Sequence, residues 1–334
     1  MIQPGGFRIA CLAAVALLLP MATLAANDYQ HYLVGDPSAA TPDPVSGGLL
    51  LMGGGDRNYD ALHWFVAKAG HGHLVVLRAS QGGEIGDEFF HDVGGLVSAE
   101  TFVFSGRGAS NDRKILASLA RADGIFIAGG DQARYVRFWK GTPIAAALDA
   151  HVAAGKPLGG TSAGLAMLGE YLYGAMDGNS ITAPQAMADP LGPGVTIESD
   201  FLHLALLHGI VTDTHFNERD RQGRLLAFLA KAETLDGDSA RALWGLGVDE
   251  SAALAVEPDG TARLYATDPA GAAWFIQGGY PDVQKPGSPL HLQRVTATGV
   301  GRGSVLHLGT RTVDHPSFRK VYTVAAGKMA EVPR

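Results

Sequence analysis

Short apolar runs that end in glycine are the feature of this sequence that most constrains its fold. Strands of this kind are predicted at 49–52, 124–128 and 156–159, and glycine pairs or triplets close them. Helices predicted at 59–69, 114–121 and 143–154 alternate with these strands and with further strands at 74–79 and 101–104. Such alternation predicts an α/β fold, a mainly parallel sheet flanked by helices on both faces. Ligands of such sheets bind beyond the carboxyl ends of the strands, where these glycines lie.

The texture of the sequence changes after about residue 250. Two apolar runs, 252–256 and 262–266, flank Asp259-Gly260 and predict a β-hairpin. A similar pattern of apolar residues around a turn recurs over 295–308, with Gly299–Gly303 at its centre. Residues 27–47, rich in Pro, Asp and Ser, are expected to form an extended lead-in. We therefore expect an α/β domain over 27–285 and a β-rich C-terminal extension over 286–334 packed on it.

The first 26 residues have the layout of a secretory signal peptide. Arg8 gives a basic start, 9–21 is apolar, and 22–26 is rich in small residues, which predicts cleavage near Ala26. The apolar stretch is short for a membrane span, which needs roughly 20 residues. Cys11 is the only cysteine and lies in this segment, so a processed chain would have neither a catalytic thiol nor a disulfide. We expect a periplasmic or secreted protein.

Charge and residue spacing argue against two classes of partner. The net charge of −7 disfavours nucleic acid, because phosphate binding requires a basic face. Several potential metal ligands lie close in sequence, namely His203, His208, Asp213 and His215, but none has a recognised metal-site spacing. We therefore expect no metal and no cofactor.

Ser162 is the strongest candidate for a catalytic residue. It lies in Gly160-Thr161-Ser162-Ala163-Gly164, which matches the G-x-S-x-G pattern of a serine elbow. A strand is predicted before it and a helix over 165–171 after it, which would expose the serine and direct the Ala163 N–H at an oxyanion. A serine that only caps a helix is the alternative. The setting favours a nucleophile, which needs a base and an acid from elsewhere in the chain.

The residue pattern proposes a base but leaves the acid open. His215 follows the apolar run 209–211, so it too is expected at the carboxyl end of a strand, although a histidine in a loop is more often a surface residue. Asp249 and Glu250 end another strand, and neighbours on a strand face opposite ways, so only one of them can reach His215.

Three arginines follow His215 at positions 219, 221 and 224. Such a run is usually a solvated helix face, on which Arg221 and Arg224 would lie together while Arg219 is offset. In an acidic protein the same arginines also suit substrate carboxylates, which the guanidinium group binds in a fork.

Four motifs in order resemble the cyanophycinase and aspartyl dipeptidase family of serine peptidases. They are Gly159–Gly164, Gly129–Gln132, Asp213–Phe216 with the three arginines, and Gly245–Glu250. The resemblance spans roughly residues 48–256. Thr214 departs from it, because cyanophycinases typically carry Gln at this substrate-contacting position. A different contact to the substrate is therefore expected there.

This resemblance implies a class I glutamine amidotransferase-like fold and a Ser-His-Glu triad. Ser162 would be the nucleophile, His215 the base and Glu250 the acid, with oxyanion donors at Gly130 and Ala163. Six residues would shape the substrate site: Gln132, Asp213, Thr214, Arg219, Arg221 and Arg224. The implied function is an exported peptidase that cleaves aspartyl peptide bonds, including β-aspartyl-arginine, without a cofactor. A homodimer is compatible with the sequence.

Two other classes of protein compete with this interpretation. An α/β-hydrolase esterase also uses G-x-S-x-G but orders its triad as serine, acid and histidine. That order would pair Asp213 or Asp236 with one of three late histidines, His291, His307 or His315. A non-catalytic binding protein would need neither a strained serine nor a histidine and an acid at matching strand ends.

Overall fold

The structure is a computed structural model that describes residues 1, 28–80, 82–236, 241–278 and 285–333. The predicted signal peptide, apart from Met1, lies outside the described residues. Within the described ranges, we find no helix with both the length and the apolar character that a membrane span requires.

The larger of two main sheets has ten strands, and its centre is parallel. In spatial order they are β1 (Tyr29–Gly35), β4 (Ser98–Phe104), β3 (His73–Arg78), β5 (Gly124–Ile127), β6 (Leu158–Thr161), β2 (Leu49–Met52), β11 (Ala252–Val256), β12 (Thr261–Ala266), β15 (Val305–His307) and β16 (Thr312–Asp314). The strands from β4 to β2 in this order run parallel, and the remaining pairs are antiparallel. The predicted mainly parallel sheet is confirmed.

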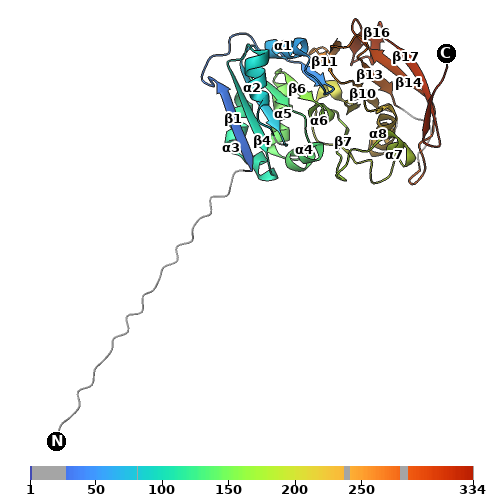
Figure 1. Ribbon diagram of the computed structural model, residues 1–334, viewed down its shortest axis with the longest axis horizontal. Helices are drawn as coiled ribbons and strands as arrows, with labels where there is room; N and C mark the ends of the chain where they lie inside the picture. Colours follow the sequence, from blue (N-terminus) through green and yellow to red (C-terminus); the bar gives the residue numbers. More distant parts are fainter. Residues whose placement is uncertain (2–27, 81, 237–240, 279–284, 334) are drawn as a thin grey trace.

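Helices cover both faces of this sheet because its strands are apolar on both sides (Figure 1). In β2, Leu49 and Leu51 pack toward α3 (Arg113–Arg121), α4 (Gln132–Trp139) and α5 (Pro143–Ala153). Their neighbours Leu50 and Met52 face the opposite side, which α1 (Tyr59–Lys68), α2 (Ile85–Asp87) and the π-helix Glu88–Val93 cover. Alternate residues of a strand point to opposite faces, so a continuous apolar run is buried twice.

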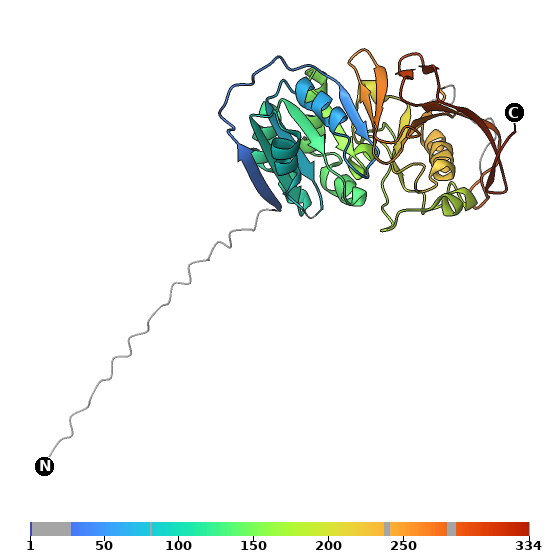
Figure 2. The same cartoon turned by 45° about the horizontal axis from the view of Figure 1, so that its top comes forward.

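A second sheet of six strands follows the first. Its order is β18 (Lys328–Glu331), β17 (Arg319–Ala325), β14 (Leu292–Val300), β13 (Ala273–Gln277), β10 (Trp244–Val248) and β9 (Ile210–Asp213). Only β9 and β10 pair in parallel among these described strands. The long C-terminal strands curve around α8 (Gln222–Leu235), with α7 (Ala183–Ala188) beside it (Figure 2). The C-terminal segment is therefore strand-rich and antiparallel, as predicted.

Two connections complete the chain between Ser162 and β9. The short helix α6 (Ala163–Ala166) follows the serine, and β7 (Leu172–Tyr173) pairs with β8 (Ile197–Glu198). Single 3₁₀ turns lie at Arg107–Asn111 and Ala205–Leu207.

The extended lead-in expected over 27–47 is wrong for its first part. Tyr29–Gly35 forms the edge strand β1, antiparallel to β4. The His31 ring stacks on Phe102, with centroids 4.7 Å apart, and bonds to Glu100 at 3.0 Å. The Pro and Ser of the following loop obscured a strand whose backbone partner, β4, is distant in sequence.

Two further local predictions are also wrong. The helix after Ser162 ends at Ala166, not at 171, because the chain turns to approach β9. A Cβ on Gly169 would lie 2.8 Å from the Ile210 carbonyl oxygen, and Tyr171 forms a parallel bridge with Val211. In addition, the segment 295–308 is no hairpin, since β14 and β15 lie in different sheets.

Candidate active site

Ser162 lies at a strained turn between β6 and α6. Its backbone has φ 53° and ψ −122°, an unfavourable left-handed conformation for a residue with a side chain. Glycines permit the turn, because a Cβ on Gly164 would lie 2.1 Å from the Ile127 carbonyl oxygen. The side chain makes no capping hydrogen bond to α6, so the helix-cap alternative does not describe it. The turn instead presents the hydroxyl beyond the carboxyl edge of the parallel sheet.

His215 reaches this hydroxyl from the second sheet. It follows β9, and its Nε2 lies 2.7 Å from the Ser162 Oγ. Its backbone also has a positive φ of 44°, and its N–H donates to the Gly53 carbonyl at 2.8 Å. Any side chain at Gly54 would collide with the imidazole, since a Cβ there would lie 2.3 Å from Cε1. The glycine triplet after β2 thus makes room for the histidine.

Glu250 lies behind the imidazole and selects its tautomer. It stands between β10 and β11, and its carboxylate contacts His215 Nδ1. Because a carboxylate can only accept a hydrogen bond, Nδ1 carries the proton and Nε2 is free to accept one from Ser162. Arg219 Nη2 lies 3.5 Å from the same carboxylate.

Burial keeps the imidazole neutral. Desolvation lowers the pKa of His215 below its ordinary value, the hydrogen bond to Glu250 opposes this, and the charges of Arg219 and Arg221 lower the pKa further. The ring therefore remains able to accept a proton at neutral pH.

Asp249, the neighbour of Glu250, points the other way. Its carboxylate accepts hydrogen bonds from Asn217 N at 3.1 Å, Ala272 N at 3.0 Å and the Trp274 indole at 3.0 Å. Burial, with the nearby charge of Glu218, raises its pKa to about 7. The strand alternation that left the acid open thus places Glu250 on the histidine and Asp249 in the interior.

The turn that follows β5 borders the serine on its other side. A Cβ on Gly129 would lie 3.3 Å from the Ser162 Cβ, and Gly130 has φ 148° with Ser80 directly against it. Ser80 accepts a hydrogen bond from Asp131 N at 2.8 Å and so supports the turn. Sequence reasoning missed Ser80, although its place just after β3 is the same kind of strand end.

Comparison with known proteins shows which family this chain resembles. The model of peptidase family S51 matches residues 104–263, a range that contains Ser162, His215 and Glu250. The chain is therefore similar to peptidase family S51 over 160 of its 334 residues. It is a serine-type peptidase, and its substrates are peptides.

The alignments with its relatives cover most of the length of this peptidase. It is 29% identical over 300 residues to the cyanophycinase of Synechococcus elongatus. This alignment covers 84% of the present chain and 86% of the relative. It is 27% identical over 232 residues to the cyanophycinase of Trichormus variabilis, spanning 66% and 71%. A peptidase from an acI-B1 Actinobacterium shares the fold, with a TM-score of 0.51 and 14% identity over 78% of this chain and 97% of that one.

Four of the six residues expected to shape the substrate site form a buried polar network: Asp213, Thr214, Arg221 and Arg224. Arg224 is 3% exposed and binds Asp213 through Nε at 2.8 Å and through Nη2. Arg221 donates to the Thr214 carbonyl at 2.9 Å and to its hydroxyl at 3.2 Å. Burial lowers the pKa of Arg221 to about 10, so it stays charged.

This network extends to residues that the sequence did not single out. Arg224 Nη1 donates to Ser180 Oγ at 2.9 Å, and Arg224 Cζ lies 5.6 Å from the ring centre of Tyr173. The Gln132 amide donates to the Tyr173 carbonyl. Arg219 is the exposed member of the arginine run, with 52% of its side chain accessible. The network fixes the backbone that carries His215.

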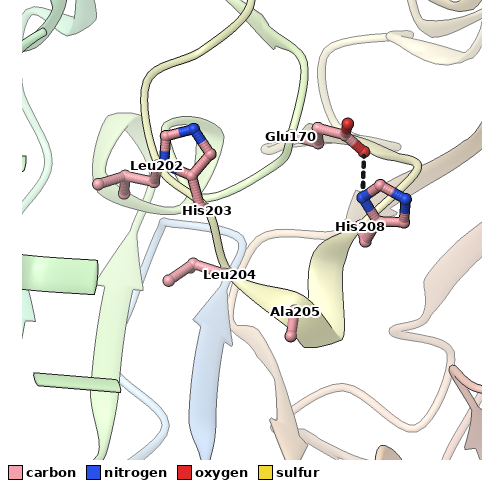
Figure 3. A pocket seen from close by; sticks show the side chains of 6 residues that line it. All are labelled: Glu170, Leu202, His203, Leu204, Ala205 and His208. Atoms are coloured by element: carbon pink, nitrogen blue, oxygen red, sulfur yellow. Dashed lines mark ion pairs between the residues drawn. The ribbon is translucent and has the colours of Figure 1, made fainter. Parts of the chain in front are cut away.

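The other histidines considered as metal ligands lie elsewhere. His208 precedes β9 whereas His215 follows it, so the two lie at opposite ends of that strand. With His203, His208 lines a separate pocket of about 360 Å³ (Figure 3). His208 pairs with Glu170 at 3.1 Å, and His203 with Asp149 at 2.8 Å. Within the described ranges, no three His, Cys, Asp or Glu side chains group as metal ligands.

Proposed function

We propose that this peptidase cleaves aspartyl peptide bonds through an acyl-enzyme on Ser162, with His215 as base and Glu250 as orienting acid. The observation that carries the proposal is the continuous contact from the Ser162 hydroxyl through the imidazole to the Glu250 carboxylate. Three residues from separate strand ends converge on one point, which a structural role does not require.

Each group has a defined step in this mechanism. His215 Nε2 takes the Ser162 proton while Oγ attacks the peptide carbonyl carbon, and the N–H groups of Gly130 and Ala163 stabilise the oxyanion. The imidazolium then protonates the leaving amine, and the acyl-enzyme forms. Water, deprotonated by the same nitrogen, attacks the ester and releases the acid and the free serine. Glu250 stabilises the imidazolium in both halves.

The positive character of the site supports an acidic substrate. Arg221 and Arg224 together face one carboxylate, Asp213, so this buried network carries an excess positive charge. Arg219 adds an exposed cation beside Glu250. The relatives of this chain are named cyanophycinases, which supports a substrate of the cyanophycin type. We include the β-aspartyl-arginine unit among the proposed substrates. The single hydroxyl of Thr214 is already bonded to Arg221, so we expect tolerance of groups other than arginine.

A matched substrate panel tests this specificity. We expect kcat/KM for aspartyl peptides, α- or β-linked, to exceed that for their asparaginyl and alanyl counterparts by about 10- to 100-fold, the value of a desolvated Arg–carboxylate contact. Released amine is measured with purified protein. Equal rates on the alanyl peptides would refute the aspartyl assignment while leaving a serine peptidase.

We also propose that the protein is exported and that residues 1–26 are removed. The basic, apolar and small-residue sections of this segment support the proposal. Mass spectrometry of the native protein is expected to find an N-terminus at Ala26 or Asn27. A mature protein that retains Met1 would contradict it.

A further inference from the structure

Among the described residues, one arginine at the catalytic edge has neither a hydrogen-bond nor an ion-pair partner. Arg78 is the last residue of β3, and β3 pairs with β5, which leads into the Gly129-Gly130 turn. β5 in turn pairs with β6, which carries Ser162 at its end. Arg78, the oxyanion turn and the nucleophile therefore follow one another along the carboxyl edge of the sheet. Ser80, two residues after Arg78, is the group that supports Gly130.

The guanidinium group of Arg78 is half-buried yet unpaired. Within the described residues it makes neither a hydrogen bond nor an ion pair, and its Nε is fully buried without an acceptor. The Glu84 carboxylate lies close by, since it and Arg78 Nη1 both border Gly82, but the two do not form an ion pair. Unpaired charge is costly to bury, so such an arginine suggests a missing anion.

The other arginines near the site are already engaged. Arg57 pairs with Glu88 at 2.9 Å, Arg134 with Asp131 at 3.5 Å and Arg219 with Glu250 at 3.5 Å. Arg221 and Arg224 are held by Thr214 and Asp213. Arg78 is thus the cation at this edge that can take a substrate carboxylate without losing a protein contact.

We propose that Arg78 is a specificity-determining residue that binds a carboxylate on the acyl side of the cleaved bond, an inference that rests on the proposed function. The leaving amine must face His215, which packs against Gly54 after β2. In the strand order β3-β5-β6-β2, Arg78 lies on the opposite side of Ser162. Two strand spacings are about 10 Å, a gap that an extended arginine and an aspartyl side chain can bridge. The guanidinium group of an arginine binds such a carboxylate through two parallel N–H···O hydrogen bonds.

The test compares Arg78→Gln with Arg78→Lys on an aspartyl peptide and its asparaginyl counterpart. We expect Arg78→Gln to reduce the aspartyl preference in kcat/KM by about 10- to 100-fold, with the asparaginyl rate nearly unchanged. Arg78→Lys should keep part of the preference, because it retains the charge but not the fork. The matched control, Arg134→Gln, removes a neighbouring arginine that is already paired and should leave the preference intact.

The outcomes distinguish the proposed role of Arg78 from the proposed function on which it rests. If the unmodified protein prefers aspartyl peptides and Arg78→Gln does so equally, the role of Arg78 is overturned and the proposed function stands. If the unmodified protein shows no preference, both fall. Labelling by a fluorophosphonate reports the serine elbow independently of substrate. A labelling rate that falls in Arg78→Gln as much as turnover does would show a structural role and would also overturn the proposal.

Discussion

Replacing Ser162 with alanine is expected to lower kcat by about 10⁶, the loss seen when a serine nucleophile is removed. The strained backbone at this position comes from the β6–α6 turn and its glycines, so alanine should occupy the same conformation and the protein should remain folded. Turnover of an aspartyl peptide and thermal unfolding measure the two effects.

A surface serine provides the control for this substitution. Ser38 is exposed and bonds only within its own loop, to Asp36 at 2.6 Å, so Ser38→Ala should leave turnover unchanged. Turnover that persists in pure Ser162→Ala protein would remove the central claim about the mechanism. Loss of turnover together with unfolding would show a structural serine instead.

Replacing His215 with alanine is expected to have an effect of the same order, about 10⁴ to 10⁶ in kcat, because the base and the nucleophile act as a unit. The late histidines His291 and His315 lie outside the contact between Ser162 and Glu250, and their alanine variants should be nearly silent. Steady-state turnover of the three variants measures this difference.

The same experiment decides between the two triad orders. An α/β-hydrolase order requires a late histidine as base, so an inactive His291→Ala or His315→Ala with an active His215→Ala would favour the esterase interpretation. His307 bonds to Asp314 at 2.9 Å within the β15–β16 hairpin, a segment distant in sequence from Ser162.

The central sheet could be predicted from the sequence because its signals are local. Each of the runs at 49–52 and 124–128 is buried on both faces and closed by glycine. The helices that alternate with the strands carry their own caps, such as Asp112 and Thr142. The hairpin at Asp259-Gly260 was likewise predictable from its turn residues. These features depend on neighbours a few residues away.

The elements that were missed depend on distant contacts. β1 is defined by its pairing with β4 across some seventy residues of chain, and the early end of α6 by the approach of Gly169 to β9. The assignment of β14 and β15 to different sheets likewise follows from their partners, not from their own residues. No local pattern of side chains encodes these pairings.

The candidate site divides in the same way. The glycine turns and the serine elbow could be located from the sequence, whereas the state of each arginine could not. Arg221 and Arg224 bind Thr214 and Asp213, whereas Arg78, which no motif marks, makes no ion pair within the described residues. Whether a charge is free depends on the groups that the fold brings to it.

The nucleophile and its base belong to different sheets, and this gives the C-terminal strands an indirect part in the reaction. β14, β17 and β18 continue the sheet through β13 to β10 and β9, the strands that lead to Glu250 and His215. The alignment of Oγ with Nε2 is therefore a measure of how the two sheets are docked. The C-terminal strands contribute no reacting group, yet they support the strands that position His215, the proton acceptor. Damage to the C-terminal strands would therefore be detected first as a loss of turnover.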